Sequence, residues 1–308
     1  MAHRAPARPI PDCLISHKDV VVINQDVPSS PVCMVVIPGI GACHLPYIAL
    51  ARLLNLHGLA VKIVIPHGYG NRDGSYGAVV VADTIVLTLD ALRDEHRPLL
   101  WAGHSAGFAA AIMAAAKLSS QTAGITAICG DQAELNRTFS NPLFTLRYFV
   151  KWARLRILLW WFRGHPREAL LKFLESDSWL PKLIAKPMVA KPAGLSQEAR
   201  KLLVRHCCHE SGADLFWANA KQLHYGWLAK LVTKPVLFII GDRDPLRDRS
   251  RRHSFQALIR RYGSIIVVRE TVLKECGHMP NVECPDRLAK AMVDFARELG
   301  YTFTAPAA

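Results

Sequence analysis

Short, mainly apolar runs alternate along the chain with segments that have helical periodicity. The runs predicted as strands are residues 19–23, 32–37, 60–65, 98–102, 124–129, 235–240 and 264–268. The segments predicted as helices are residues 45–56, 78–94, 108–117, 254–262 and 285–299. A strand that is apolar at nearly every position is covered on both faces, which indicates a parallel sheet between helices. The pattern therefore predicts a doubly wound, mostly parallel α/β fold.

The alternation stops between residues 132 and 233, where the pattern predicts helices interrupted by proline and glycine. We expect this segment to be a helical cap inserted into an α/β core formed by residues 1–131 and 234–308. Residues 143–173 of the cap mix aromatic and aliphatic side chains with arginine and lysine. This composition favours cap helices packed over a hydrophobic substrate pocket, and a peripheral contact with a membrane surface is the alternative interpretation.

Composition limits the class of partner. The chain has 308 residues, 51% of them hydrophobic, which is enough to bury the core of one large domain with an insertion. Lysine and arginine outnumber acidic residues by 38 to 25, and the net charge of +13 favours anionic lipids, carboxylate or phosphate substrates, or nucleic acid. Because the chain has no zinc-finger spacing, basic-region helix or RNA-binding signature, we expect no nucleic-acid partner.

The eight cysteines are scattered, as is typical of reduced thiols in a cytosolic protein. Cys207 and Cys208 lie between His206 and His209, but neighbouring positions on a helix project about 100° apart and cannot all face one ion. We therefore expect no metal site. Because no apolar run has the length of a signal peptide or a membrane span, we expect a cytoplasmic protein, with membrane association through the cap as the alternative.

One serine lies where a predicted strand turns directly into an alanine-rich helix. Gly103 and Gly107 stand two residues before and two residues after Ser105, and small residues there relieve the crowding of so tight a turn. The turn lifts the serine hydroxyl clear of the sheet, and the amides that begin the following helix point toward the same place. By composition alone, such a string occurs by chance in about one chain in ten of this length. The strand-turn-helix context therefore predicts that Ser105 is a catalytic nucleophile.

An acid and a histidine follow the serine in chain order, each in a loop after a predicted strand. Asp244 follows the strand 235–240, and His278 follows the strand 264–268. A serine hydroxyl needs a neutral imidazole to accept its proton, and the imidazole needs a carboxylate to orient it. Loops at the carboxyl edge of one parallel sheet can bring the three side chains together, so the order predicts a Ser-His-Asp triad.

These segments resemble the α/β-hydrolase superfamily, specifically its capped serine esterases, monoacylglycerol lipases and peptidase-like hydrolases. The resemblance covers about residues 20–299. It rests on Gly-His-Ser-Ala-Gly at 103–107, Gly-Asp-Arg-Asp-Pro at 241–245 and Gly-His-Met-Pro-Asn-Val-Glu-Cys-Pro at 277–285. It implies an α/β-hydrolase fold with an inserted cap and catalysis by a serine acyl-enzyme.

The resemblance also implies roles for single residues. It makes Asp244 the acid in preference to Asp242, and some relatives use the position of Asp131 instead. It implies that the backbone amides of Ile40 and Ala106 form the oxyanion hole.

The sequence thus predicts a serine hydrolase that cleaves an ester with a hydrophobic acyl or alcohol part. Dehalogenase and epoxide-hydrolase chemistry is disfavoured because those relatives have an aspartate at the position of Ser105. The alternatives are an acyltransferase with the same triad and a hydrolase-fold binding protein without catalysis. No cofactor is expected.

Overall fold

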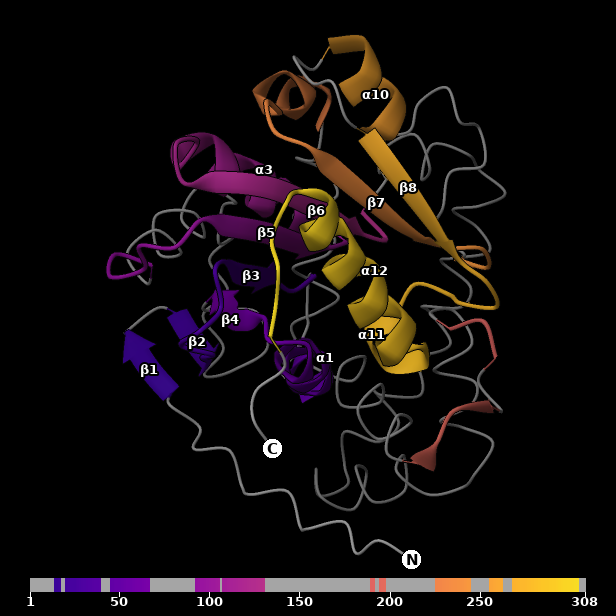
Figure 1. The fold of residues 1–308 in the computed structure, drawn as a ribbon. Coiled ribbons are helices and arrows are strands. Elements are labelled where there is room, and N and C mark those ends of the chain that lie inside the picture. Colours follow the sequence, from indigo (N-terminus) through magenta and orange to yellow (C-terminus); the bar gives the residue numbers. More distant parts are fainter. Residues whose placement is uncertain are drawn as a thin grey trace, which may run out of the picture.

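The computed structural model describes residues 14–17, 20–39, 45–66, 92–105, 107–130, 189–191, 194–197, 225–244, 255–262 and 268–304. Across these residues, eight strands form one sheet in the order β1-β2-β4-β3-β5-β6-β7-β8 (Figure 1). The strands are β1 (Leu14–His17), β2 (Val20–Gln25), β3 (Cys33–Ile37), β4 (Ala60–Pro66), β5 (Leu99–His104), β6 (Thr122–Ile128), β7 (Val236–Gly241) and β8 (Val268–Leu273).

Most neighbouring strands in this sheet are parallel. The pairs β1–β2 and β2–β4 are antiparallel, and every pair from β4 through β3, β5, β6 and β7 to β8 is parallel. The predicted mostly parallel α/β fold is therefore confirmed. The parallel strands end at the same edge of the sheet, and the loops beyond that edge hold the predicted catalytic residues.

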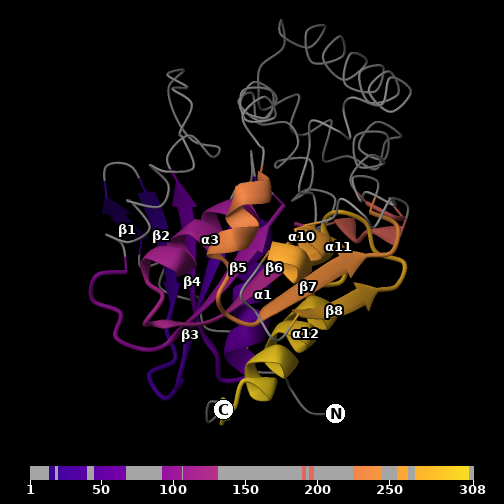
Figure 2. The ribbon, with the colours of Figure 1, turned by 90° about the horizontal axis from the view of Figure 1, so that it is seen from above.

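Helices cover both faces of the sheet (Figures 1 and 2). One face packs against α1 (Leu45–Leu56) and α12 (Pro285–Glu298), which follows the short α11 (Pro280–Glu283). The other face packs against α3 (Gly107–Lys117), α10 (Phe255–Tyr262) and the 3-10 helix η3 (Tyr225–Leu231). None of the described helices has the length and apolar character needed to span a membrane.

The central strand β3 shows why its sequence is apolar throughout. Val35 and Ile37 pack with the α3 layer, while Met34 and Val36 pack with α1 and α12. All four side chains are buried, because successive residues of a strand face opposite sides of the sheet. Burial on both faces is the reason that this strand could be predicted from its sequence.

The structure corrects three of the predicted elements. The strand predicted at 264–268 continues beyond residue 268, since β8 is Val268–Leu273, and residues 263–267 lie outside the described part. The helix predicted over 78–94 does not include residues 92–94, which form turns, and its earlier residues lie outside the described part. The loop predicted after β8 contains the short helix α11.

The cap predicted over residues 132–233 lies mostly outside the described residues, so its extent stays a prediction. The segment 143–173, Asp131 and the Cys207-Cys208 pair also lie outside them. Within the predicted span, the described residues Leu228 and Ala229 of η3 are buried in the core beside α3.

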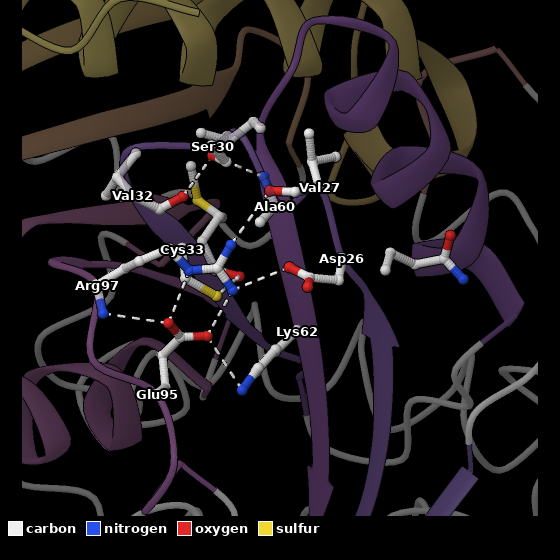
Figure 3. A network of polar contacts seen from close by, with 12 residues as sticks. Asp26, Val27, Ser30, Val32, Cys33, Ala60, Lys62, Glu95 and Arg97 are labelled. Carbon is white, nitrogen blue, oxygen red and sulfur yellow. Dashed lines mark hydrogen bonds and ion pairs between the residues drawn. The ribbon is translucent and has the colours of Figure 1, made fainter. Parts of the chain in front are cut away.

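A charged network lies near the amino ends of β3 and β5, at the edge opposite the predicted catalytic loops (Figure 3). The buried carboxylate of Glu95 accepts hydrogen bonds from Arg97 Nε and Nη2, each at 2.7 Å, and pairs with Lys62 Nζ at 3.1 Å. Arg97 also pairs with Asp26 at 2.9 Å and donates to the carbonyl of Val27 at 3.2 Å. Burial by itself raises the pKa of Glu95, but the hydrogen bonds from Arg97 and Lys62 lower that pKa to about 2.

Candidate active site

Ser105 occupies a sharp turn between β5 and α3. Its φ of 51° lies in the left-handed region, which residues with a side chain rarely adopt. Two backbone hydrogen bonds hold the turn: the Ser105 amide donates to the carbonyl of Ile128 on β6 at 2.8 Å, and the Phe108 amide donates to the Ser105 carbonyl at 3.1 Å. The serine is therefore held in a strained conformation at the carboxyl end of a central strand.

The two glycines that flank the serine are required by close backbone contacts. A Cβ atom at Gly103 would lie 2.5 Å from the carbonyl oxygen of Gly107 and closer still to the backbone of Phe108. A Cβ atom at Gly107 would overlap the carbonyl oxygens of Ile37 and Pro38. The turn thus needs a glycine on each side because α3 begins directly against β5 and the end of β3.

The loop after β3 passes beside the serine. A Cβ atom at Gly39 would lie 3.2 Å from the Ser105 Cβ and 3.1 Å from the carbonyl oxygen of His104. Gly39 thus lies next to the turn that holds the serine. The predicted oxyanion-hole residues Ile40 and Ala106 lie outside the described residues.

His278 and Asp244 form a buried pair. His278 Nδ1 lies 2.9 Å from Asp244 Oδ2, and each side chain is 2% exposed. Because a carboxylate only accepts hydrogen bonds, Nδ1 is the donor, and Nε2 of the neutral ring is then the basic nitrogen. Asp242, the alternative acid, instead accepts a hydrogen bond from the Cys276 amide at 3.1 Å through Oδ1.

His104 connects the serine turn to the histidine loop. His104 Nε2 lies 2.8 Å from the carbonyl oxygen of His278, and Nδ1 lies 2.7 Å from the hydroxyl of Tyr47 on α1. Since a carbonyl only accepts, Nε2 donates, and Nδ1 accepts from the tyrosine hydroxyl. The imidazole rings of His104 and His278 are 5.2 Å apart between centroids. Among the hydrogen bonds found for the described residues, none joins Ser105 to His278, and such bonds commonly tighten only when substrate binds.

Glu283 holds the backbone on both sides of His278. Its Oε1 accepts from the Gly277 amide at 2.9 Å and from the Met279 amide at 3.4 Å, while Oε2 accepts from the Ala190 amide at 2.7 Å. Burial raises the pKa of Glu283, and these three hydrogen bonds act against that rise. The carboxylate thereby joins the histidine loop to residues 189–191.

The sequence analysis missed Tyr47, the bridging role of His104 and the role of Glu283. A tyrosine in a mainly apolar helix and a histidine inside the serine turn were the local signals. Their contacts join residues far apart in the chain, so periodicity could not reveal them.

Cys129 lies beside the His278–Asp244 pair at the end of β6. The candidate ligand atoms of Cys129, Asp244 and His278 lie within 4.8 Å of one another. Burial raises the pKa of the Cys129 thiol well above its ordinary value, and the negative charge of Asp244 raises it further. In this structure the His278 and Asp244 atoms of the trio are hydrogen-bonded to each other at 2.9 Å, which favours a donor–acceptor pair over ligands shared by one ion.

Comparisons with known proteins agree with this fold. A sequence model of the alpha/beta hydrolase family matches residues 34–291. No curated protein matches the chain in sequence.

Among solved structures, the chain is similar to a putative lipase from Acinetobacter baumannii, with a TM-score of 0.62, 15% identity and coverage of 91% of this chain and 88% of the lipase. It is also similar to a carboxylesterase structure from Nitrososphaera gargenis, with a TM-score of 0.60, 18% identity and coverage of 91% and 96%. A thermophilic esterase from Thermogutta terrifontis gives a TM-score of 0.60, 15% identity and coverage of 91% and 94%. At these identities the structural likeness shows a shared fold.

Proposed function

Since this chain belongs to the alpha/beta hydrolase family, we propose that it is a serine hydrolase that cleaves carboxylic esters. In this proposal Ser105 is the nucleophile, His278 the general base and Asp244 the acid that orients the histidine. The observation that carries the proposal is the buried 2.9 Å hydrogen bond between His278 and Asp244, in the loop that His104 ties to the strained serine turn.

The reaction has two stages. The Ser105 hydroxyl attacks the ester carbonyl while His278 Nε2 accepts its proton, and the Asp244 carboxylate stabilises the imidazolium that forms. The amides of Ala106 and Ile40 donate hydrogen bonds to the oxyanion. The alcohol then leaves with the proton of the imidazolium. Water, activated by the same nitrogen, hydrolyses the acyl-enzyme and restores the serine.

We propose that the substrate carries a hydrophobic acyl or alcohol part. The support is the apolar and aromatic composition of residues 143–173 together with the lipase and esterase names of the structural neighbours. The cations of the same segment support a peripheral contact with anionic membranes. Co-sedimentation with anionic vesicles at low salt tests that contact, and protein that stays in the supernatant would exclude it.

Labelling with a fluorophosphonate probe tests the nucleophile. We expect the probe to label the purified protein, mass spectrometry to locate the adduct on Ser105, and Ser105→Ala to abolish labelling. Ser29→Ala is the matched control, because Ser29 lies exposed in a turn after β2 and its loss should leave labelling unchanged. A folded protein that the probe does not label would favour the non-catalytic binding protein.

Product analysis separates hydrolysis from acyl transfer. With an ester substrate and an added primary alcohol, we expect free acid as the main product. A predominance of the new ester would make the chain an acyltransferase with the same triad.

A further inference from the structure

Two buried cysteines lie at the ends of the segment that carries His278. Cys276 directly precedes Gly277, and Cys284 ends α11 and caps the start of α12. Their Sγ atoms are 3.0 Å apart, about 1 Å beyond the ~2.05 Å of a disulfide bond. Both are free thiols in this structure. Two thiols are therefore held in contact across the base of the histidine loop.

The surroundings of the two thiols differ. Cys284 stands at the N-terminus of the 14-residue helix α12 without a side-chain capping bond, and it is 7% exposed. The hydrogen bond from Cys276 lowers the pKa of Cys284, and the charge of Arg287 acts in the same direction. The same hydrogen bond, together with burial, raises the pKa of Cys276. Cys284 is thus the sulfur that we expect to react first, because it lies at a helix N-terminus and is more exposed than Cys276. Either sulfur can donate in the hydrogen bond between them.

We propose that Cys276 and Cys284 are a redox modification site that forms a reversible disulfide across the base of the histidine loop. The bond would close a ring over residues 276–284 that contains His278 and Glu283.

The oxidant can be a peroxide. The Cys284 thiolate attacks one oxygen of hydrogen peroxide, an S–O bond forms, the O–O bond breaks, and the hydroxide that leaves takes up a proton as water. The sulfur of Cys276 then attacks the sulfenic acid at Cys284. The S–S bond forms, the S–O bond breaks, and hydroxide leaves with the Cys276 proton as a second water. Two thiols and one peroxide thus give one disulfide and two waters, and a dithiol reductant reverses the change.

The backbone around the pair is already anchored, so the bond requires little rearrangement. The Cys276 amide donates to Asp242 at 3.1 Å, and its carbonyl accepts from the Arg243 amide at 2.9 Å. The Cys284 amide donates to the Pro280 carbonyl at 2.9 Å. A covalent link between two points that are fixed in the folded state acts mainly by restricting the unfolded chain, so the oxidised protein should be the more stable form.

Peptide mapping of the full-length protein after peroxide treatment tests the site directly. Free thiols are blocked by alkylation under denaturing conditions, and the digest is analysed without reduction. We expect a peptide pair joined through Cys276 and Cys284, its disappearance after dithiothreitol, and a Tm about 5 °C higher in the oxidised protein. Linkage of either cysteine to a different partner, or two cysteines that remain fully alkylatable, would overturn the proposal.

Two variants sharpen the result. Cys284→Ser should lose both the linked peptide and the Tm rise. Cys33→Ala is the control, because it removes another buried thiol, at the opposite edge of the sheet, and should retain both. Peptide mapping of the unsubstituted protein tests the disulfide by itself, even if one of the variants does not fold. None of these readouts needs a substrate, so the outcome is independent of whether Ser105 proves to be a nucleophile.

Discussion

At the scale of single residues, hydrogen-bond direction determines which ring nitrogen of His278 and of His104 carries the proton. The Asp244 carboxylate can only accept, so it fixes the proton of His278 on Nδ1 and leaves Nε2 as the basic nitrogen of the neutral ring. The His278 carbonyl can only accept from His104, which fixes the second ring in the same way. Both proton positions follow because the partner, a carboxylate or a carbonyl, cannot donate. A ring with one donor and one acceptor nitrogen suits each position.

Replacement of the acid tests this assignment. Asp244→Asn removes the charge that stabilises the imidazolium and can offer Nδ1 a donor in place of an acceptor, so kcat should fall by about 10³ to 10⁴. Ester-hydrolysis kinetics at neutral pH measure the effect, and circular dichroism checks that the variant folds. Asp242→Asn is the matched control and should lower kcat less than tenfold. An equal loss in the two variants would contradict the choice of Asp244.

At the scale of elements, burial decided which strands could be predicted. Strands β3 and β7 are buried on both faces, and their apolar runs predicted them to within a residue or two. The edge strand β8 carries exposed Arg269 and Glu270, so its sequence lacks that signal and its end, predicted at residue 268, was placed too early. Helix α1 was predicted with its observed bounds, because its apolar positions recur with helical spacing and Gly58 follows its end.

The close approach of α3 to the end of β3 gives a prediction at this scale. In Gly107→Ala, the new Cβ would overlap backbone carbonyls of Ile37 and Pro38, which cannot move without displacing the central strand. We expect the free energy of unfolding, measured by urea titration, to be about 3 kcal/mol lower in the variant. We also expect the fluorophosphonate probe no longer to label Ser105. Gly194→Ala is the control, because its Cβ would meet only the side chain of Lys191 at 3.8 Å. A variant at Gly107 with unchanged stability would contradict the observed packing.

At the scale of the whole molecule, the candidate triad and the buried charged network of Glu95 lie at opposite edges of the sheet. The carboxyl ends of β5, β7 and β8 lead to the candidate triad, whereas the Glu95 network closes the amino ends of β3 and β5 (Figure 3). A buried carboxylate with several donors strongly destabilises a protein when one partner is removed. The network should therefore affect folding without affecting the reaction.

The pH dependence of stability tests the role of Glu95. Its folded-state pKa of about 2 is below the unfolded value near 4.3. Its contribution to the free energy of unfolding is therefore complete above about pH 4.3 and is lost as pH falls toward 2. In Glu95→Gln the free energy of unfolding at pH 7 should be lower by up to about 3 kcal/mol. The plot of that free energy against pH should also become flatter between pH 2 and 4.5. The kcat of this variant should match that of the unsubstituted protein, as a fluorogenic ester assay would show.

The exposed pair of Asp294 and Lys290 provides the control for this experiment. Asp294→Asn removes an i,i+4 ion pair on the surface of α12, where water screens the charges, and should cost less than about 0.5 kcal/mol. Equal losses at Glu95 and Asp294 would show that burial of the network contributes nothing.

The sequence by itself indicated the alternation of strands and helices from β2 onward, although not β1 or α11. It also indicated the serine between its glycines and the acid and histidine that follow it. These features are local, because backbone geometry and burial on both faces act on neighbouring residues. The tertiary structure places Asp244, the acid already expected from the sequence, against His278. It alone decided that Tyr47 and Glu283 support the two loops and that Cys276 touches Cys284. Those contacts depend on how loops converge at the carboxyl edge of the sheet. That convergence follows from packing of the whole chain and leaves no periodic signal in the sequence.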